Sequence, residues 1–337
     1  MTDAGPLRLA VTTNAETFAR VREPLAERGI DATHLPAKGR SIPLSGDRNG
    51  GVADANTSDA TDPLTFDVGF VYPSRVMEGG ALDARLDVPW VNGRDAVLTS
   101  RNKAGVIATL DAAGVPTPRT TMISNPVDEA IVADAVAEFT FPVVVKPNSA
   151  TRGVGVAKAT DLDSLLGVVD YLNLVHDYRA TGDKSYLIQE FLPNATDYRV
   201  MVVDGEYAGA VERRLPPDAL EAGRWKHNVH RGATARGVEL GPEARSLAER
   251  TAEILGIDWL GVDLLAIGGR EATADAEAGG DDDDADSRVD GDGADLGDGR
   301  LLVNETNARP TVDEATKYDS DFHDRLAALI ERTADGD

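Results

Sequence analysis

Residues 141–156, which read FPVVVKPNSATRGVGV, are the stretch that decides the fold. The apolar, largely β-branched run at 142–145 predicts a buried strand, which Lys146 ends before Pro147. The loop 148–155 is small, polar and glycine-containing, so successive backbone N–H groups can approach the oxygens of a bulky anion. A lysine at the end of a strand beside such a loop suggests a nucleoside triphosphate site. The alternative is a glycine-rich turn with a surface lysine.

Length and composition indicate more than one domain. A chain of 337 residues predicts two or three domains, since one core serves about 100–200 residues, and 42% hydrophobic content suffices for such cores. No apolar run reaches transmembrane length and the first residues do not resemble a signal peptide, so we expect a cytoplasmic protein that is not bound to a membrane. The absence of cysteine excludes disulfides, thiolate metal sites and cysteine nucleophiles.

The net charge of −24 argues against nucleic-acid binding, which requires a basic surface. The acids are mostly Asp and are spread along the whole chain. This pattern favours a halophilic protein, because a short Debye length in concentrated salt screens self-repulsion. The alternative is an acidic tail or a partner-binding surface. Lysine is scarce, which makes Lys103 and Lys146 candidates for function rather than for surface charge.

The beginning of the chain predicts a small parallel α/β domain. Its signals are a strand at 7–12, a helix at 15–28 and a strand at 66–72. Strand–helix–strand order is typical of a parallel sheet, and the segment lacks the GxGxxG dinucleotide fingerprint. A helix predicted at 98–114 then carries Lys103 in its first turns; the alternative for this lysine is a solvated position on the helix.

The remainder predicts mixed helices and strands. Asp204-Gly205 between two apolar runs predicts a hairpin of strands 199–203 and 207–213. Residues 267–300 are dominated by Asp, Gly and Ala, and we expect a disordered acidic insert because this composition cannot bury a core. The other predicted elements are helices at 128–138, 161–179, 242–255 and 319–333, and strands at 186–192, 257–266 and 301–305.

Three oxygen-bearing side chains, Asp263, Glu305 and Asn307, predict a metal site. Asp263 lies inside the apolar run GVDLLA, where a carboxylate without a partner is costly. Glu305 and Asn307 follow an apolar run and point to the same face, since strand side chains alternate. If the two strands pair, these hard oxygen ligands converge in a way that suits Mg²⁺ with nucleotide phosphates. The alternative is polar strand ends capped by water.

Other chemistries lack their motifs. The five histidines offer no zinc spacing, and the chain has neither a GxSxG nucleophile elbow nor a Walker A pattern. Any phosphate site must therefore rest on Lys103, Lys146 and the loop 148–155.

Six fragments stand in an order that is specific as a set. They are RNKAGVIATLDAAGVPTPRT, VVVKPNSATRGVGV, QEFLPNATDYRVMVVDGEYAGAVERR, KHNVHRGATA, GIDWLGVDLLA and LLVNETNARP. Together they resemble the ATP-grasp superfamily and, within it, the RimK-like amino-acid (glutamate) ligases. The resemblance implies an ATP-grasp fold of mixed α/β and α+β class. Its parts would be an N-terminal domain at 1–97, a first lobe at 98–185 and a second lobe at 186–337, with ATP clamped between the lobes.

The resemblance also implies roles for individual residues. Residues 189–192 would form the hinge against adenine, and Asp197 would bind a ribose hydroxyl. The full ATP set is Lys103, Lys146, Gly153, Gly155, Gln189, Glu190, Phe191, Leu192, Asp197, Lys226, His227 and Asn228. Asp263, Glu305 and Asn307 would hold Mg²⁺, with Mn²⁺ as an alternative. Arg199, Arg214 and Arg231 would face the acyl phosphate or substrate carboxylates.

The implied activity is ADP-forming carbon–nitrogen ligation. The γ-phosphoryl group of ATP moves to a carboxylate, and an amine then attacks the acyl phosphate. The implied partners are an amino acid such as glutamate and a small-molecule, peptide or protein acceptor, and the family suggests a homo-oligomer. The alternatives are a glutathione-synthetase-like peptide ligase and a non-catalytic ATP-binding regulator. After Asn307 the chain reads ARPTV where ribosomal-protein-modifying relatives have a Ser-Pro-Gly turn, which leaves the acceptor open.

Overall fold

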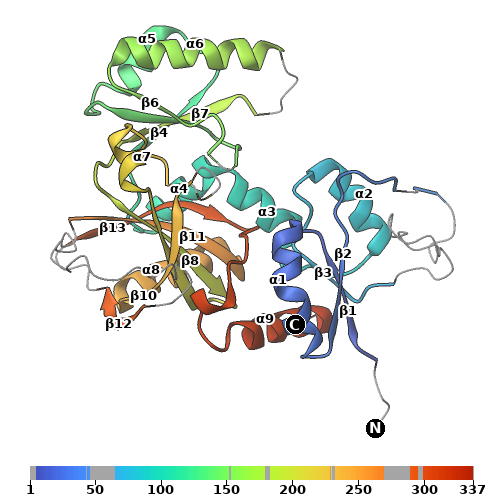
Figure 1. Ribbon diagram of the computed structural model, residues 1–337. Helices are drawn as coiled ribbons and strands as arrows, with labels where there is room; N and C mark the ends of the chain where they lie inside the picture. The colour runs from blue at the N-terminus through green and yellow to red at the C-terminus, as the bar shows by residue number, and fades with distance from the viewer. Residues whose placement is uncertain are drawn as a thin grey trace.

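The computed structural model describes residues 5–42, 44–45, 65–151, 153–178, 183–227, 229, 232–268, 289–294 and 299–336. Figure 1 shows three parts: an N-terminal domain on the right, a first lobe at the top and a second lobe below it. A parallel three-stranded sheet, an antiparallel four-stranded sheet and a mostly antiparallel six-stranded sheet form their centres. This mixture confirms the predicted α/β and α+β class.

The N-terminal domain is built on the parallel sheet, in the strand order β2-β1-β3. Asn14 fixes the beginning of its first helix, because the side-chain oxygen accepts the amide of Thr17 at 2.8 Å. The elements are β1 (Leu7–Val11), α1 (Ala15–Ala26), β2 (Ile30–His34), β3 (Val68–Phe70) and α2 (Val76–Leu86). Two helices, α3 (Arg94–Arg101) and α4 (Lys103–Ala112), lead from it to the lobes.

The first lobe contains an antiparallel sheet in the order β4-β7-β5-β6. Helices α5 and α6 supply apolar residues to a shared core with the sheet. Asp161 caps α6, because its side chain accepts the amide of Ser164 at 2.7 Å. The elements are β4 (Thr120–Ser124), α5 (Glu129–Ala135), β5 (Val143–Pro147), β6 (Ala157–Ala159), α6 (Leu162–Tyr178) and β7 (Ser185–Glu190).

The second lobe contains the six-stranded sheet, in the order β12-β10-β9-β8-β11-β13. The predicted hairpin is confirmed: Asp204 and Gly205 join β8 to β9, both with positive φ. The elements are β8 (Thr196–Val203), β9 (Glu206–Arg214), α7 (Pro217–Glu221), β10 (Thr234–Leu240), α8 (Pro242–Leu255), β11 (Trp259–Ile267), β12 (Val289–Ala294), β13 (Arg300–Asn307), the 3₁₀ turn η2 (Ala315–Lys317) and α9 (Phe322–Asp335).

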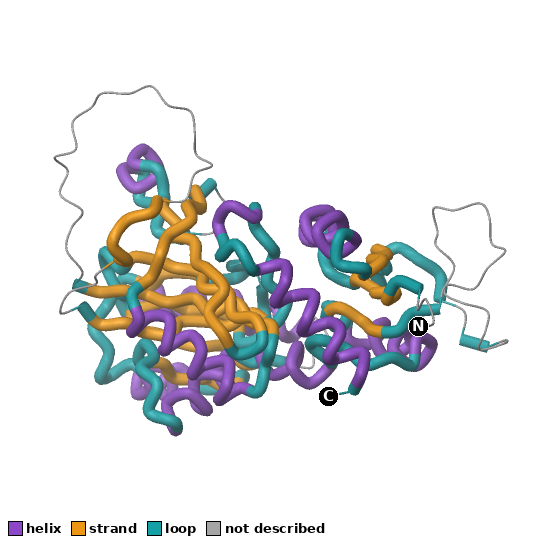
Figure 2. The backbone as a smooth tube through the Cα atoms, turned by 90° about the horizontal axis from the view of Figure 1, so that it is seen from below, coloured by secondary structure: helices purple, strands orange, loops and turns teal. Residues whose placement is uncertain are grey.

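The six-stranded sheet has an apolar core on each face. One face packs with α4 and α8, while one end of the other face shares a core with α9 and the N-terminal domain. In that joint core the rings of Phe70 and Trp259 meet edge to face at 5.5 Å. Figure 2 shows helices between the strands of the second lobe and those of the N-terminal domain. The N-terminal domain is therefore fixed on the second lobe, and the rest of that sheet face remains for the site.

Three sequence-based expectations differ from the structure. The helix predicted at 98–114 is two helices, because Asn102 leaves helical geometry with ψ of 84°. Strand β7 pairs with β4 and β5, so it belongs to the first lobe's sheet, whereas the predicted second lobe starts at 186. The loop predicted throughout 267–300 is wrong at β12, which pairs with β10 at the sheet edge. An edge strand needs backbone pairing on only one side, which an Asp/Gly-rich segment can supply.

None of the helices in the described part of the chain is both long and apolar enough to cross a membrane.

Candidate functional site

Lys103 is placed by an interlock of two asparagines. Asn102 caps α4 by accepting the amide of Gly105 at 3.1 Å, and the same oxygen accepts Nδ2 of Asn148 at 3.0 Å. The side-chain oxygen of Asn148 in turn accepts the amide of Ala104 at 2.8 Å. The start of α4 is thereby tied to the loop that follows β5. Lys103, the first residue of α4, is buried, and its ammonium donates to the carbonyl of Ala150 in that loop.

Lys146 lies on β5 with only 5% of its surface exposed. Its ammonium donates to Oε1 of Gln189 at 3.0 Å, and Nε2 of Gln189 donates to Thr120 at 2.9 Å. The Gln189 side chain therefore orients the lysine instead of pointing at a ligand. Burial lowers the pKa of Lys146 to about 8; the carboxylates of Glu305 and Asp263 act to raise it, and Lys103 acts to lower it.

The loop after β5 needs its glycines. Gly153 and Gly155 have φ of 64° and 75°, a region that favours glycine. A Cβ on Gly155 would also lie 2.7 Å from Cγ of Pro147. Lys226, from the second lobe, donates to the carbonyl of Val156 and so joins the two lobes across this loop.

The predicted adenine hinge, residues 189–192, spans the end of β7. Glu190 is held by Arg119, whose amide donates to Oε1 of Glu190 at 2.8 Å. The ring of Phe191 meets Trp225 edge to face at 5.7 Å, and Lys158 lies 4.8 Å from the centre of the Phe191 ring. A pocket of about 470 Å³ is lined by residues 223–226, and Leu192 is half-buried beside Phe191 in the chain. An aromatic pair flanked by cationic side chains thus stands where the two lobes join.

Carboxylates and arginines alternate across one face of the six-stranded sheet. Asp263 on β11 lies directly opposite Glu305 on β13 and opposite Arg199 on β8. Nη2 of Arg199 donates to Oδ2 of Asp263 at 2.9 Å, and Nη2 of Arg213 approaches the same oxygen at 3.0 Å. Burial acts to raise the pKa of Asp263, but the charges of Arg199 and Arg213 outweigh it and hold the pKa below its usual value.

Arg213 extends this network to the predicted ribose ligand. Nε of Arg213 donates to Oδ1 of Asp197 at 2.8 Å, and Nδ1 of His227 lies 3.9 Å from Oδ2 of Asp197. Burial raises the pKa of Asp197, against the opposing charge of Arg213. One buried guanidinium therefore bridges Asp197 and Asp263.

Lysines from one side of the site meet carboxylates from the other. The ammonium of Lys103 lies 3.3 Å from Oε1 of Glu305. Lys146 is close enough to Glu305 and Asp263 for both to influence its pKa. The two lysines and the two carboxylates, which are scattered in the sequence, thus form one constellation at the junction of the lobes.

Some predicted residues do not join this constellation. Arg214 alternates to the opposite face from Arg213 and pairs with Glu212, while 58% of its side chain is exposed. Asn307 lies opposite Gly261, and its side-chain oxygen accepts the amide of Arg309 at 2.9 Å. Asn228 and Arg231 lie outside the residues that the structure describes.

The predicted metal ligands fit Mg²⁺ in kind and in register. Asp263, Glu305 and Asn307 supply hard oxygens from two neighbouring strands, and Glu305 remains 32% exposed. At present their partners are cationic side chains or a backbone amide. Among the described residues no cluster of three or more His, Asp or Glu side chains could hold a metal, so the amide of Asn307 would have to complete this set.

The sequence prediction did not include Arg213 or Asn148. Arg213 shares an Arg-Arg pair with Arg214, and only the strand register decides which of the two faces the site. Asn148 belongs to the loop 148–155 that follows the predicted central strand, but its partner Asn102 was predicted to lie inside one continuous helix, 98–114.

Comparisons with known proteins identify the family of this chain. A family model of the RimK-like ATP-grasp domain matches residues 100–271, which is just over half of the chain. A "Probable alpha-L-glutamate ligase" from Thioalkalivibrio sulfidiphilus is 32% identical over 179 residues, 52% of this chain and 54% of the relative. A "Ribosomal protein bS6--L-glutamate ligase" from Escherichia coli is 29% identical over 177 residues, again 52% and 54% of the two chains. The match spans about half the length of these relatives.

Solved structures share the fold over nearly the whole chain. The D-cycloserine synthetase DcsG has a TM-score of 0.64 with 18% identity, over 97% of this chain and 99% of that one. The ATP-grasp ligase PsnB, complexed with precursor peptide PsnA2 and AMPPNP, has a TM-score of 0.60 with 17% identity, over 99% of both chains. These likenesses confirm the ATP-grasp fold. On the family match, the chain belongs to the RimK-like ATP-grasp family.

Proposed function

We propose that this protein is an ATP- and Mg²⁺-dependent carboxylate–amine ligase that forms an amide bond through an acyl phosphate and releases ADP. The observation that carries the proposal is the meeting of Lys103 and Lys146 with Asp263 and Glu305 at the lobe junction. Buried lysines and carboxylates that face one another are costly to desolvate unless a charged ligand binds both kinds of group. A magnesium nucleotide does so, because its phosphates bind the lysines and its metal binds the carboxylates.

Residues at different positions of the site would bind different parts of the nucleotide. Lys103, Lys146 and the backbone of the Gly153–Gly155 loop would hold the phosphates. The segment after β7, beside Phe191 and Trp225, would hold the adenine. Oδ1 of Asp197 is engaged by Arg213, which leaves Oδ2 for a ribose hydroxyl.

The arginines would stabilise negative charge on the reacting groups. Arg199 lies on β8, between Asp263 on β11 and Val211 on β9. When a metal binds Asp263, Arg199 can leave this carboxylate and donate to an oxyanion instead. Asp263, Glu305 and Asn307 would hold Mg²⁺, with Mn²⁺ as a substitute. The metal would neutralise charge on the phosphates. We assign no such role to Arg214, which faces away.

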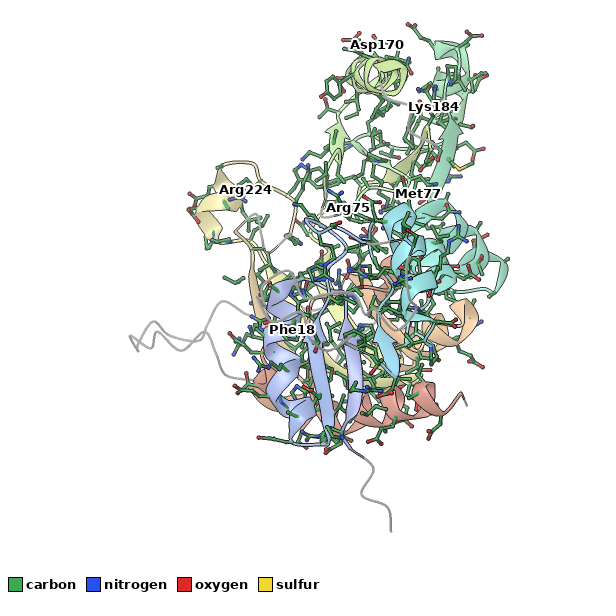
Figure 3. The ribbon with its side chains drawn as sticks, turned by 90° about the vertical axis from the view of Figure 1, so that its right-hand side faces the viewer. Phe18, Arg75, Met77, Asp170, Lys184 and Arg224 are labelled. Atoms are coloured by element: carbon green, nitrogen blue, oxygen red, sulfur yellow. The ribbon has the colours of Figure 1, made fainter. Side chains whose placement is uncertain are left out.

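The test is product formation by the purified protein. With ATP, Mg²⁺ and a pool of amino acids and peptides, we expect release of ADP and phosphate together with a new amide mass. Lys146→Ala and Glu305→Ala should each abolish this turnover, while Lys184→Ala, at an exposed position of the first lobe (Figure 3), should leave it unchanged. Turnover that survives both site substitutions would contradict the assignment.

Further parts of the proposal concern the setting of the enzyme. We propose a cytoplasmic protein adapted to high salt, supported by the net charge of −24 and by acids spread along the chain. An amino acid such as glutamate and a peptide or small-molecule acceptor are the proposed substrates, and nucleic acid is not. Self-association, which light scattering would measure, is proposed from the family alone.

A further inference from the structure

Two arginines beside the proposed site have no carboxylate partner among the residues that the structure describes. Nη1 of Arg309 donates to the carbonyls of Tyr72 and, at 3.2 Å, of Val71, and Nη2 donates to the carbonyl of Thr12 at 3.0 Å. Nη2 of Arg101 donates to the carbonyl of Ser74 at 2.7 Å. Within the described ranges, neither guanidinium has a carboxylate within ion-pair distance.

This is unexpected because both arginines are partly buried, where a charge without a partner is costly. The sequence has 58 Asp and Glu against 34 Lys and Arg, so an unpaired arginine is not due to a shortage of acids. Burial, and then the charge of Arg101, lower the pKa of Arg309 to about 10, and burial lowers that of Arg101. The arginines that do form ion pairs with carboxylates include Arg8, Arg20, Arg28, Arg75, Arg119, Arg199, Arg213, Arg214, Arg245, Arg325 and Arg332.

The pair lies at an edge where ligands commonly bind. Thr12 follows β1 and Val71 follows β3, so Arg309 caps the carboxyl ends of two parallel strands. Open parallel sheets bind ligands outside the carboxyl ends of their strands. Val71 has φ of 62°, which is unusual for a β-branched residue and marks this edge as a constrained position.

The same edge adjoins the proposed phosphate and metal site. Arg101 comes two residues before Lys103, and Arg309 comes two residues after Asn307. The ends of α3 and β13 are joined directly, because Oγ of Ser100 accepts the amide of Ala308 at 2.9 Å. The backbone segments that carry Arg101 and Arg309 therefore adjoin the elements that carry Lys103 and Glu305.

We propose that Arg101 and Arg309 bind a carboxylate of the substrate that does not itself react. The substrate class is then an acid with a further carboxylate, such as a dicarboxylic amino acid or a peptide that carries one. Guanidinium groups suit this task, because their planar donors match a carboxylate and their charge is nearly permanent. The assignment of the ligand as substrate depends on the proposed function, since it needs a reacting centre at Lys103 and Glu305.

Arg309 would then determine specificity within the fold. It stands in the Ala308-Arg309-Pro310 turn, directly after the predicted metal ligand Asn307. A side chain at this point can contact the substrate while the neighbouring residues bind ATP. Loss of Arg309 should weaken binding of the acidic substrate without weakening binding of ATP.

The first experiment measures binding independently of catalysis. The melting temperature of the whole protein is followed against rising L-glutamate, and against L-glutamine at matched ionic strength, with and without Mg²⁺ and AMP-PNP. We expect L-glutamate to raise the melting temperature of the wild type clearly more than L-glutamine. Arg309→Met and Arg101→Gln should remove this difference.

Two variants separate an effect of the lost charge from an effect on folding. Arg101→Gln leaves the three carbonyl contacts of Arg309 in place, so it answers the question if Arg309→Met does not fold. Arg75→Gln is the matched control, because Arg75 is a nearby exposed arginine paired with Glu78, and it should keep the preference for L-glutamate. Figure 3 shows Arg75 on the side of the N-terminal domain that faces the first lobe.

The second experiment measures turnover on an acidic substrate and on its amide analogue. Arg309→Met should raise KM for the acidic substrate about tenfold and leave KM for ATP unchanged. Equal stabilisation by L-glutamate and L-glutamine in the wild type, or an undiminished preference in Arg101→Gln, would overturn the proposal. Absence of ADP release with every acid–amine pair would instead overturn the proposed function, and the binding experiment would still decide whether the arginines bind carboxylate.

Discussion

The ammonium of Lys103 lies 3.3 Å from Oε1 of Glu305, although one begins α4 and the other lies near the end of β13. This contact joins the proposed phosphate side of the site to the proposed metal side before any ligand is bound. A magnesium nucleotide would replace it with two interactions, one between lysine and phosphate and one between carboxylate and metal. The contact therefore shows how close together the two halves of the ligand would have to lie.

Lys146 should make the ligand-free protein less stable at neutral pH. Its pKa is about 8 in the folded state, against 10.5 for an unperturbed lysine, so between these values the unfolded chain binds more protons and stability rises with pH. Lys146→Met should therefore stabilise the protein at pH 7, by at most about 3 kcal/mol, and by less at pH 9.5. Loss of the hydrogen bond to Gln189 reduces the gain.

Urea unfolding at the two pH values measures this effect. Lys184→Met, at an exposed lysine, is the control and should give the same small change at both. If Lys146→Met proved equally destabilising at pH 7 and pH 9.5, the buried charge would not be the cause.

Arg213 should be the most important arginine for stability. It bridges the buried Asp263 and Asp197, whose side chain is only 14% exposed, so Arg213→Gln leaves two carboxylates with too few cationic partners. We expect a loss of about 3–5 kcal/mol in the free energy of urea unfolding. Arg119→Gln breaks an ion pair in which both side chains are at least half exposed, and should cost less than about 1 kcal/mol. Equal losses in the two variants would argue against a buried network.

The register explains why Arg213, and not the predicted Arg214, faces the site. A regular hairpin around Asp204-Gly205 would pair Asp197 with Glu212 and put Arg214 on the face of Arg199. In the structure the pairing moves from Val202–Tyr207 to Met201–Gly209, so Ala208 forms a bulge. Every later residue of β9 changes face, and Arg213 enters the site. The turn could be predicted from its residues, whereas the bulge depends on Gly209, with φ of 130°, packing under Tyr318.

Much of the site could be predicted because it consists of charges in apolar strands. Asp263 and Glu305 stand out in the sequence, and the structure brings them face to face. The break at Asn102 was not predicted, because the hydrogen bond between Asn102 and Asn148 joins residues that are far apart in the sequence. Arg309 was noted in the sequence only as a departure from the family turn, and its contacts with the β1 and β3 edges became visible only in the fold.

Asn102 should matter for nucleotide binding beyond its role as a helix cap. Asn102→Ala removes the cap of α4 and the partner of Asn148, so Lys103 loses its fixed position. We expect about 1 kcal/mol less stability and weaker binding of AMP-PNP, measured by calorimetry. Asp161→Ala removes the cap of α6 and should cost similar stability while leaving AMP-PNP binding unchanged. Similar effects of both variants on binding would contradict the proposed interlock.

Gly155 should tolerate no side chain. Gly155→Ala imposes a positive φ on alanine and brings Cβ to 2.7 Å from Cγ of Pro147, so the phosphate loop must shift. Gly29→Ala has the same backbone cost, with φ of 80°, but no atom within 4 Å. We expect both to lower stability by about 1–2 kcal/mol and only Gly155→Ala to weaken AMP-PNP binding about tenfold or more. Unchanged binding by Gly155→Ala would remove the loop from the nucleotide site.

Calorimetric titration with AMP-PNP, with and without Mg²⁺, tests the central claim most directly. The wild type should bind the nucleotide, and Mg²⁺ should strengthen binding about tenfold or more. Lys146→Met should weaken binding under both conditions, whereas Glu305→Gln should keep metal-free binding and lose the strengthening by Mg²⁺. Wild-type binding that ignores Mg²⁺, or two variants that bind like the wild type, would contradict a magnesium-nucleotide site formed by these lysines and carboxylates.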